Sequence, residues 1–304
     1  MERHELLRKI AAFHLASRDL AEDLLAGEFA SVFRGQGIEF DEVRQYEAGD
    51  DIRSIDRNVS ARFGKPFVKL YREERELTVF IVLDCSASMR SGGIFPNGGK
   101  GGLSRYEQGV LAAALLAFSA ERTGQRVGAV LFDRDITRIY SPRKGKSHVL
   151  AIISAALGAE NPGRGSGLGT ALSGTGRLLK RRSLVAVISD FLCVNWEQEL
   201  GGLCARHDVI ALRITDPLDS EMPRMGLAAL EDGETAYRFH ALTSSSSFRT
   251  AWSEWHDDRS RSWQAICRRA GAARLELSTS TDVSSVLARF FRGELRRNYR
   301  TRRH

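Results

Sequence analysis

The chain has 304 residues, four cysteines and a formal net charge of +7. Its length allows one large domain and a smaller appendage. Its apolar content of 42% is enough to bury a core without disulfides or a structural metal. The cysteines lie far apart and form no CxxC pair, which excludes a disulfide framework and a zinc ribbon. We therefore expect a reduced, cytoplasmic environment.

The sequence contains no recognisable export signal or membrane span. Residues 1–10 mix both charge signs and lack the apolar centre of a signal peptide. The longest largely apolar stretch, Val110–Phe118, is far shorter than the roughly 20 residues that cross a bilayer. The end of the chain is rich in arginine, which is typical of a solvated basic helix, and binding of nucleic acid by this tail is a minor alternative.

Residues 1–76 are predicted to form a small segment that is separate from the rest of the chain. Apolar residues at helical spacing predict a helix over Glu2–Ala26, and Pro66–Tyr71 is the clearest of several short strands. Its charged residues form either a structural ion-pair network or a surface that binds a partner. The partner-binding candidates are Arg44, Asp50, Asp51, Arg53 and Asp56.

Residues 77–304 alternate strands and helices at short spacing, which predicts an α/β fold with a doubly wound, mostly parallel sheet. Residues 217–242 break this alternation and predict a hairpin inserted at about residues 216–243. The predicted strands are Thr78–Asp84, Arg126–Phe132, Ile136–Tyr140, Ser183–Asp190, Asp208–Ile214 and Arg274–Leu277. The predicted helices are Arg105–Arg122, Ser147–Leu157, Trp196–Ala205, one from the glycine-rich GRGSGLGT to Lys180, one from the Ser244–Ser247 run to Ala270, and one from Asp282.

Oxygen-bearing side chains follow the buried strands of this predicted sheet. Asp84, Ser86 and Ser88 end the stretch TVFIVLDCSASM, Asp190 ends SLVAVISD, and Thr170 lies at the start of a helix. Since parallel strands bring their carboxyl ends to one edge, we expect these groups to converge there. Hydroxyls and carboxylates suit Mg²⁺, or Mn²⁺ or Ca²⁺, rather than Zn²⁺. A coordination position left to solvent would accept an Asp or Glu of a partner protein.

The motifs DCSASM, GLGTAL and VISDF, in this order, resemble the metal-ion-dependent adhesion site of von Willebrand factor A domains, which have a Rossmann-like sheet. The resemblance implies that Ser86, Ser88 and Thr170 are direct metal ligands. It also implies that Asp84 and Asp190 act directly or through water.

The segments FRGQGIEFDEVRQYEAGDDIRSID, NVSARFGKPFVKLYREERELTVF and DPLDSEMPRMGLAALEDGET resemble the bacterial domain-of-unknown-function 58 family. Arg57 departs from the family pattern, which usually has tryptophan there. The resemblance implies partnership with MoxR-type AAA+ ATPases and a role in the chaperone-like maturation of other proteins.

The expected function is therefore a non-enzymatic, metal-dependent protein-interaction module that binds an AAA+ ATPase or its client. The alternative is a Mg²⁺-dependent hydrolase that uses the same oxygens. A phosphatase would carry a second aspartate where Ser86 stands, and the RKGKS sequence lacks the leading glycine of a phosphate-binding loop because Tyr140 holds that place. No GxSxG motif is present, the histidines lack catalytic spacing, and Cys85 is predicted to be a buried neighbour rather than a nucleophile.

Overall fold

The computed structural model describes residues 39–47, 50, 55–72, 77–93, 102–159, 165–231, 235 and 237–291. The chain divides into two compact units, with Phe33–Leu77 forming the smaller one and Thr78 beginning the main part of the larger one. The helix predicted over Glu2–Ala26, two partner-binding candidates (Asp51 and Arg53) and most of the arginine-rich tail lie outside the described residues.

The smaller unit consists of an antiparallel strand pair and a short helix. Strand β1 (Glu39–Gln45) pairs with β2 (Phe67–Arg72), and α3 (Arg57–Phe63) lies between them in sequence. The Asp56 carboxylate caps α3 by accepting two backbone N–H groups, and Gly64 ends the helix with a φ of 67°. The sequence predicted only strands and turns here, because α3 buries none of its residues and so carries no periodic apolar pattern.

The larger unit is built on a six-stranded sheet with the order β10-β7-β6-β3-β4-β5. All neighbouring strands are parallel except β5, which is antiparallel to β4 at one edge. This confirms the predicted α/β class and the mostly parallel sheet. The strands are β3 (Thr78–Asp84), β4 (Arg126–Phe132), β5 (Ile136–Arg143), β6 (Leu184–Ser189), β7 (Asp208–Thr215) and β10 (Ala273–Ser278).

The two central strands, β3 and β6, are buried on both faces, which explains their unbroken apolar sequences. The edge strand β5 has mostly exposed or half-buried side chains, as expected for a strand with only one neighbour. The helices of the unit are α4 (Arg105–Arg122), α5 (Lys146–Leu157), α6 (Leu168–Leu178), α7 (Glu197–Cys204), α8 (Pro217–Ser220) and α9 (Ser246–Ala270). Residues 283–291 are also helical, and Ser88–Arg90 form the 3₁₀ turn η2.

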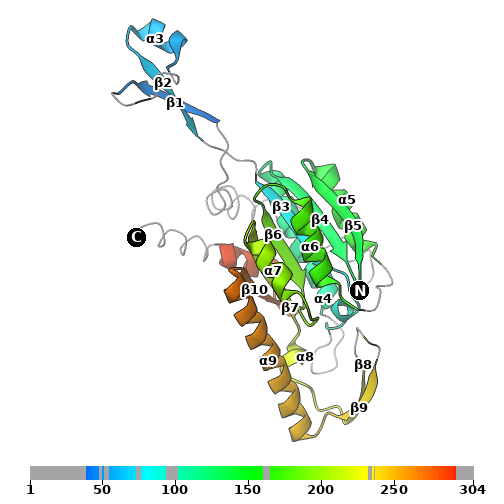
Figure 1. Cartoon of the computed structure of the whole chain (residues 1–304). Helices are drawn as coiled ribbons and strands as arrows, with labels where there is room; N and C mark the ends of the chain where they lie inside the picture. Colours follow the sequence, from blue (N-terminus) through cyan, green and yellow to red (C-terminus); the bar gives the residue numbers. More distant parts are fainter. Residues whose placement is uncertain are drawn as a thin grey trace. The chain divides into compact units, whose positions relative to one another are not determined.

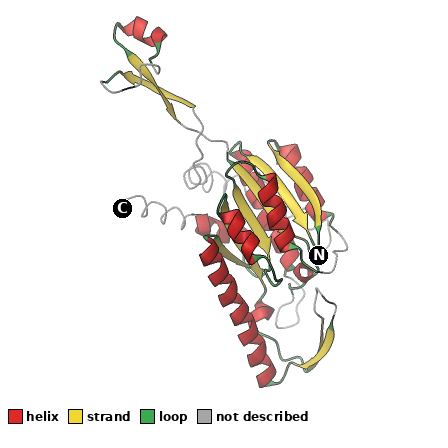
Figure 2. Ribbon diagram, in the orientation of Figure 1, coloured by secondary structure: helices red, strands yellow, loops and turns green. Residues whose placement is uncertain are grey.

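Helices cover both faces of the sheet (Figures 1 and 2). Phe80 and Val82 of β3 share one core with α6, α7 and the Trp263 end of α9. The alternate residue Leu83 faces α4, where a side chain at Gly109 would lie 3.5 Å from it. This alternation decides which side chains reach which face at the ends of the strands.

A two-stranded antiparallel ribbon lies within the range where the sequence predicted a hairpin. Strand β8 (Leu227–Glu231) pairs with β9 (Arg238–Leu242), with Leu227 opposite Leu242. Among the described residues, no helix is both long enough and apolar enough to cross a membrane.

Candidate metal centre

Asp84 and Asp190 lie at the carboxyl-end edge of the central sheet. Strands β3 and β6 are parallel neighbours with Leu83 opposite Ile188, so Asp84 ends its strand level with Ser189. Asp84 is fully buried and Asp190 is 3% exposed. The two strands predicted to end in aspartates therefore bring both carboxylates to one place in the fold.

Hydroxyl groups surround the carboxylate of Asp84. Its Oδ2 accepts hydrogen bonds from Ser189 Oγ at 2.6 Å and from Ser166 Oγ at 3.3 Å, and its Oδ1 accepts from the backbone N–H of Ser86 at 2.9 Å. Burial, reinforced by the nearby charge of Asp190, raises the pKa of Asp84 to about 7, although the hydrogen bonds from Ser189 and Ser86 oppose the rise. A divalent cation would relieve this repulsion between carboxylates.

Asp190 has one carboxylate oxygen without a hydrogen-bond partner among the described residues. Its Oδ1 accepts the backbone N–H of Leu192 at 3.0 Å. Its Oδ2 is buried and accepts no hydrogen bond from any described residue. Buried polar atoms are nearly always satisfied, so an orphaned carboxylate oxygen beside a second carboxylate fits a cation site.

Ser86 and Ser88 form the third part of the cluster. Ser86 is buried, Ser88 is half-buried at the start of η2, and their Oγ atoms lie 3.2 Å apart. Among the described residues, no group of three or more His, Cys, Asp or Glu side chains could hold a metal. A cation at this edge would therefore be held by two carboxylates and several hydroxyls, a donor set that suits Mg²⁺.

Thr170 makes no hydrogen bond to the cluster among the described residues. It is the third residue of α6, its side chain is exposed, and no hydrogen bond joins it to Asp84, Ser86, Ser88 or Asp190 within the described residues. The hydroxyl that reaches Asp84 from this segment belongs to Ser166. The direct ligand role that the resemblance implies for Thr170 stays a prediction.

The sequence prediction missed Ser166 and Ser189. Ser189 was detectable, because strand alternation places it on the same face as Val187, toward α6, where Asp84 also points. Ser166 lies in the glycine-rich segment before α6, and no local pattern indicates that its side chain reaches Asp84.

Two cysteines border the cluster as neutral thiols. Burial raises the pKa of Cys85 and of Cys193 to about 12, so neither is a thiolate at neutral pH. Cys85 also accepts a hydrogen bond from Tyr106 Oη at 3.7 Å. The burial confirms that Cys85 is a buried neighbour of the cluster, and the absence of a nucleophilic role stays a prediction.

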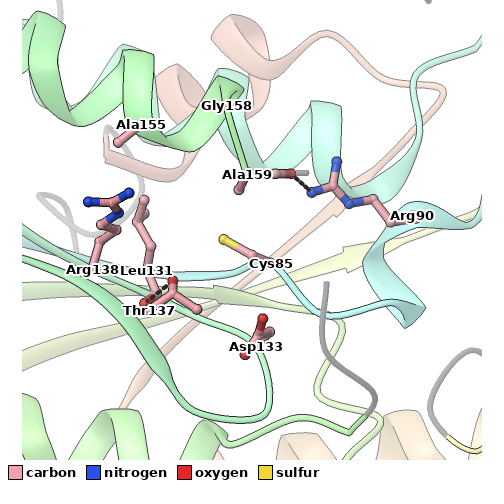
Figure 3. Close-up of a pocket in the computed structure, with 9 residues that line it drawn as sticks. All are labelled: Cys85, Arg90, Leu131, Asp133, Thr137, Arg138, Ala155, Gly158 and Ala159. Carbon is pink, nitrogen blue, oxygen red and sulfur yellow. Dashed lines mark hydrogen bonds between the residues drawn. The ribbon is translucent and has the colours of Figure 1, made fainter. Parts of the chain in front are cut away.

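A cavity of about 330 Å³ lies beside Cys85, between the sheet and the α5 end (Figure 3). The guanidinium of Arg90 stacks 3.6 Å from the ring centroid of Tyr106 and donates a hydrogen bond to the Ala159 carbonyl. The lining residues are Cys85, Arg90, Leu131, Asp133, Thr137, Arg138, Ala155, Gly158 and Ala159.

The buried carboxylate of Asp216 is hydrogen-bonded to the loop that follows the candidate metal site. Asp216, just beyond β7, accepts the N–H of Gly93 at 2.9 Å and the hydroxyl of Thr279 at 2.7 Å through Oδ2. Its Oδ1 caps α8. Next to it, Asp219 forms an ion pair with Arg105. The start of the predicted hairpin region thus holds the loop after β3, a role that the sequence analysis did not identify.

The partner-binding candidates in the smaller unit have structural contacts. Arg44 forms an ion pair with Asp50 at 2.7 Å, and Asp56 caps α3. The backbone N–H of Glu47, and then the Arg44 guanidinium, lower the pKa of Asp50. A role of these residues in binding a partner stays a prediction.

Residues 42–262 match the family described as "Protein of unknown function DUF58". The chain belongs to the DUF58 family. An uncharacterized protein of Mycobacterium tuberculosis, Rv1480, is 31% identical over 235 residues, which cover 76% of this chain and 72% of that protein. An uncharacterized protein of Mycobacterium avium, MAV169, is 32% identical over 130 residues, which cover 42% of this chain and 76% of that protein.

Among solved structures, the chain is similar to the conserved hypothetical protein BatB of Bacteroides thetaiotaomicron. The TM-score is 0.45 at 14% identity, covering 72% of this chain and 99% of BatB. The DUF58 match spans most of the smaller unit and the larger unit into α9. Because these DUF58 relatives are uncharacterized, a functional proposal depends on the geometry of the candidate site.

Proposed function

We propose that this DUF58 protein is a non-enzymatic, divalent-metal-dependent protein-interaction module whose larger unit acts as a von Willebrand factor A-like domain. The observation that carries the proposal is the orphaned Oδ2 of buried Asp190 beside the buried Asp84 carboxylate. Ser86 and Ser88 supply hydroxyl oxygens at the same edge. Mg²⁺ is the cation that this oxygen set fits best.

The surroundings of the site support an acidic partner residue as the group that completes the coordination. Arg90 and Arg138 line the cavity beside Cys85, and Asp133 is the one acidic residue among its described lining residues. Guanidinium groups attract carboxylates through charge-assisted hydrogen bonds. The partner we propose is a cytoplasmic MoxR-type AAA+ ATPase, or a client of that ATPase.

Metal binding is tested by titrating Mg²⁺ into the full chain by calorimetry. We expect Asp190→Asn to weaken Mg²⁺ binding at least tenfold, because one anionic oxygen donor becomes an amide. Asp258→Asn, the same change on the exposed face of α9, is the control and should bind as wild type. Equal Mg²⁺ affinity in all three proteins would contradict the proposed metal centre.

Partner binding is tested by capture of a purified MoxR-type ATPase from the same organism. Capture should require Mg²⁺, be lost with a chelator or with Asp190→Asn, and persist with Asp258→Asn. Undiminished capture under both treatments would contradict a metal bridge. Mg²⁺-dependent turnover of a phosphoester that Asp190→Asn abolishes would instead favour the hydrolase alternative.

A further inference from the structure

A basic groove lies at the edge of the sheet opposite the candidate metal centre. Its volume is about 550 Å³. It forms where the connection from α6 to β6 meets the connection from α7 to β7, since these parallel strands begin side by side with Leu184 opposite Asp208. Its charged and titratable lining residues are Arg177, Lys180, Arg181, Arg182, Arg206 and His207.

Most of the cations in this groove have no acidic partner in the part of the chain that the structure describes. Arg182 is neutralised by Asp208, to which it donates two hydrogen bonds, of 3.0 Å from Nε and 2.6 Å from a terminal nitrogen. No described carboxylate lies within ion-pair distance of the other groove cations: Arg177, Lys180, Arg181 and Arg206. The negative end of the α6 dipole accounts for a cation such as Arg177 in the last turn of that helix. It does not explain why cations of the α6–β6 connection and of the α7–β7 connection line the same groove.

Gly176 allows Arg206 to lie against α6. A Cβ at this position would come within 2.7 Å of a terminal nitrogen of Arg206. Glycine inside a helix is less favourable than alanine, and here it leaves room for a guanidinium. The backbone of α6 therefore leaves the space that the guanidinium of Arg206 occupies.

His207 lines the same groove and lacks a hydrogen-bond partner. Its side chain is 4% exposed, and neither ring nitrogen bonds to any described residue. Burial and the charge of Arg206 lower the pKa of His207, so the ring is neutral at pH 7 and carries one N–H donor. An oxyanion seated among the neighbouring cations is the kind of acceptor that this N–H lacks.

We propose that the groove binds a small ligand that carries two or more linked phosphate groups. Its volume lies within the range of small-molecule sites, roughly 300–1,000 Å³. The unpaired charges exceed what one carboxylate would neutralise, and guanidinium groups match phosphate oxygens in pairs. The cations converge on one hollow instead of forming a track, which favours a compact anion over a nucleic-acid strand. This site is independent of the proposed metal centre.

The test is calorimetric titration of inorganic pyrophosphate into the full chain at low ionic strength, without divalent cations. We expect saturable binding that Arg206→Ala weakens at least tenfold. Gly176→Ala should also weaken it several-fold, although the net charge is unchanged, because the new methyl displaces Arg206. Arg143→Ala, which removes an exposed cation from β5, is the control and should bind as wild type.

Thermal unfolding of each variant establishes that it is folded, and Lys180→Glu on the surface provides a second test if Gly176→Ala does not fold. Absence of saturable pyrophosphate binding would overturn the proposal. So would an equal loss of affinity in Arg143→Ala, or tighter binding of single-stranded DNA or of a polyglutamate peptide than of pyrophosphate through the same residues.

Discussion

The two edges of the central sheet differ in charge and in burial. At the carboxyl-end edge, Asp84 and Asp190 are buried beside serine hydroxyls. At the opposite edge, Arg177 and Lys180 are exposed and belong to a groove whose cations, except Arg182, have no carboxylate partner among the described residues. Both arrangements arise because parallel strands all end at one edge of the sheet and all begin at the other. The loops that follow the strands therefore lie together at one edge, and the loops that precede them lie together at the opposite edge. The comparison shows that one topology can build an acidic and a basic site from unrelated segments.

At the carboxyl-end edge, we expect Asp84 to bind metal and Asp216 to stabilise the fold. Substitutions should separate these two roles. Asp84→Asn should weaken Mg²⁺ binding about a hundredfold, because the buried anionic donor is lost. It should leave the free energy of unfolding without metal unchanged or higher, since it removes a negative charge from beside Asp190. Calorimetry and urea unfolding measure the two effects.

Asp216→Ala should show the opposite behaviour. The N–H of Gly93, the hydroxyl of Thr279 and the cap of α8 lose their acceptor, so we expect a loss of about 3 kcal/mol in the free energy of unfolding. Thr279→Val, which removes one of these bonds, should cost about 1 kcal/mol. A hundredfold loss of Mg²⁺ affinity in Asp216→Ala would show that these two carboxylates do not have separate purposes.

At this edge, the strands could be predicted from the sequence, but the contacts made by the loops could not. Strands β3 and β6 were predictable to within one residue because buried parallel strands have continuous apolar sequences, and an aspartate ends β3 and directly follows β6. The contacts of Ser166 with Asp84 and of Gly93 with Asp216 join segments far apart in sequence through loops. Such contacts depend on the loop path, which has no periodic signal.

The basic groove was missed for a related reason. Arg177, Lys180 and Arg206 look like ordinary solvated charges in the sequence, and only the parallel pairing of β6 with β7 brings them together. His207 lies immediately before β7, and its burial without a hydrogen-bond partner among the described residues was not detectable from neighbouring positions in the sequence.

Buried neutral histidines should make the larger unit sensitive to mild acid. Burial lowers the pKa of His207 and of His256 below the ordinary value of 6.5. The unfolded chain therefore takes up protons at these positions before the folded chain does, so the contribution of the two histidines to the free energy of unfolding should fall as the pH decreases below about 6.5. Above that pH both states are neutral and the effect vanishes. Protonation of Asp84, whose pKa is raised to about 7 in the folded chain, acts in the opposite direction over the same range.

Urea unfolding at pH 7.5 and pH 5.5 measures this dependence. On going from pH 7.5 to pH 5.5, the free energy of unfolding of His207→Gln should fall less, or rise more, than that of wild type, whereas the same substitution at the exposed His240 should leave the wild-type change unaltered. An identical pH dependence in wild type and His207→Gln would show that the ring of His207 does not contribute to the acid sensitivity.

The smallest effect that we expect tests the charge balance of the basic groove directly. Asp208→Asn removes the carboxylate that neutralises Arg182, and so adds one unpaired cation to the lining. Pyrophosphate should bind two- to threefold more tightly by calorimetry, because the added charge lies at a partly exposed position screened by solvent. The free energy of unfolding should change by less than about 1 kcal/mol, as is typical of a surface ion pair. Weaker pyrophosphate binding in Asp208→Asn would mean that the groove recognises its ligand by the geometry of the Arg182–Asp208 pair and not by its excess of positive charge.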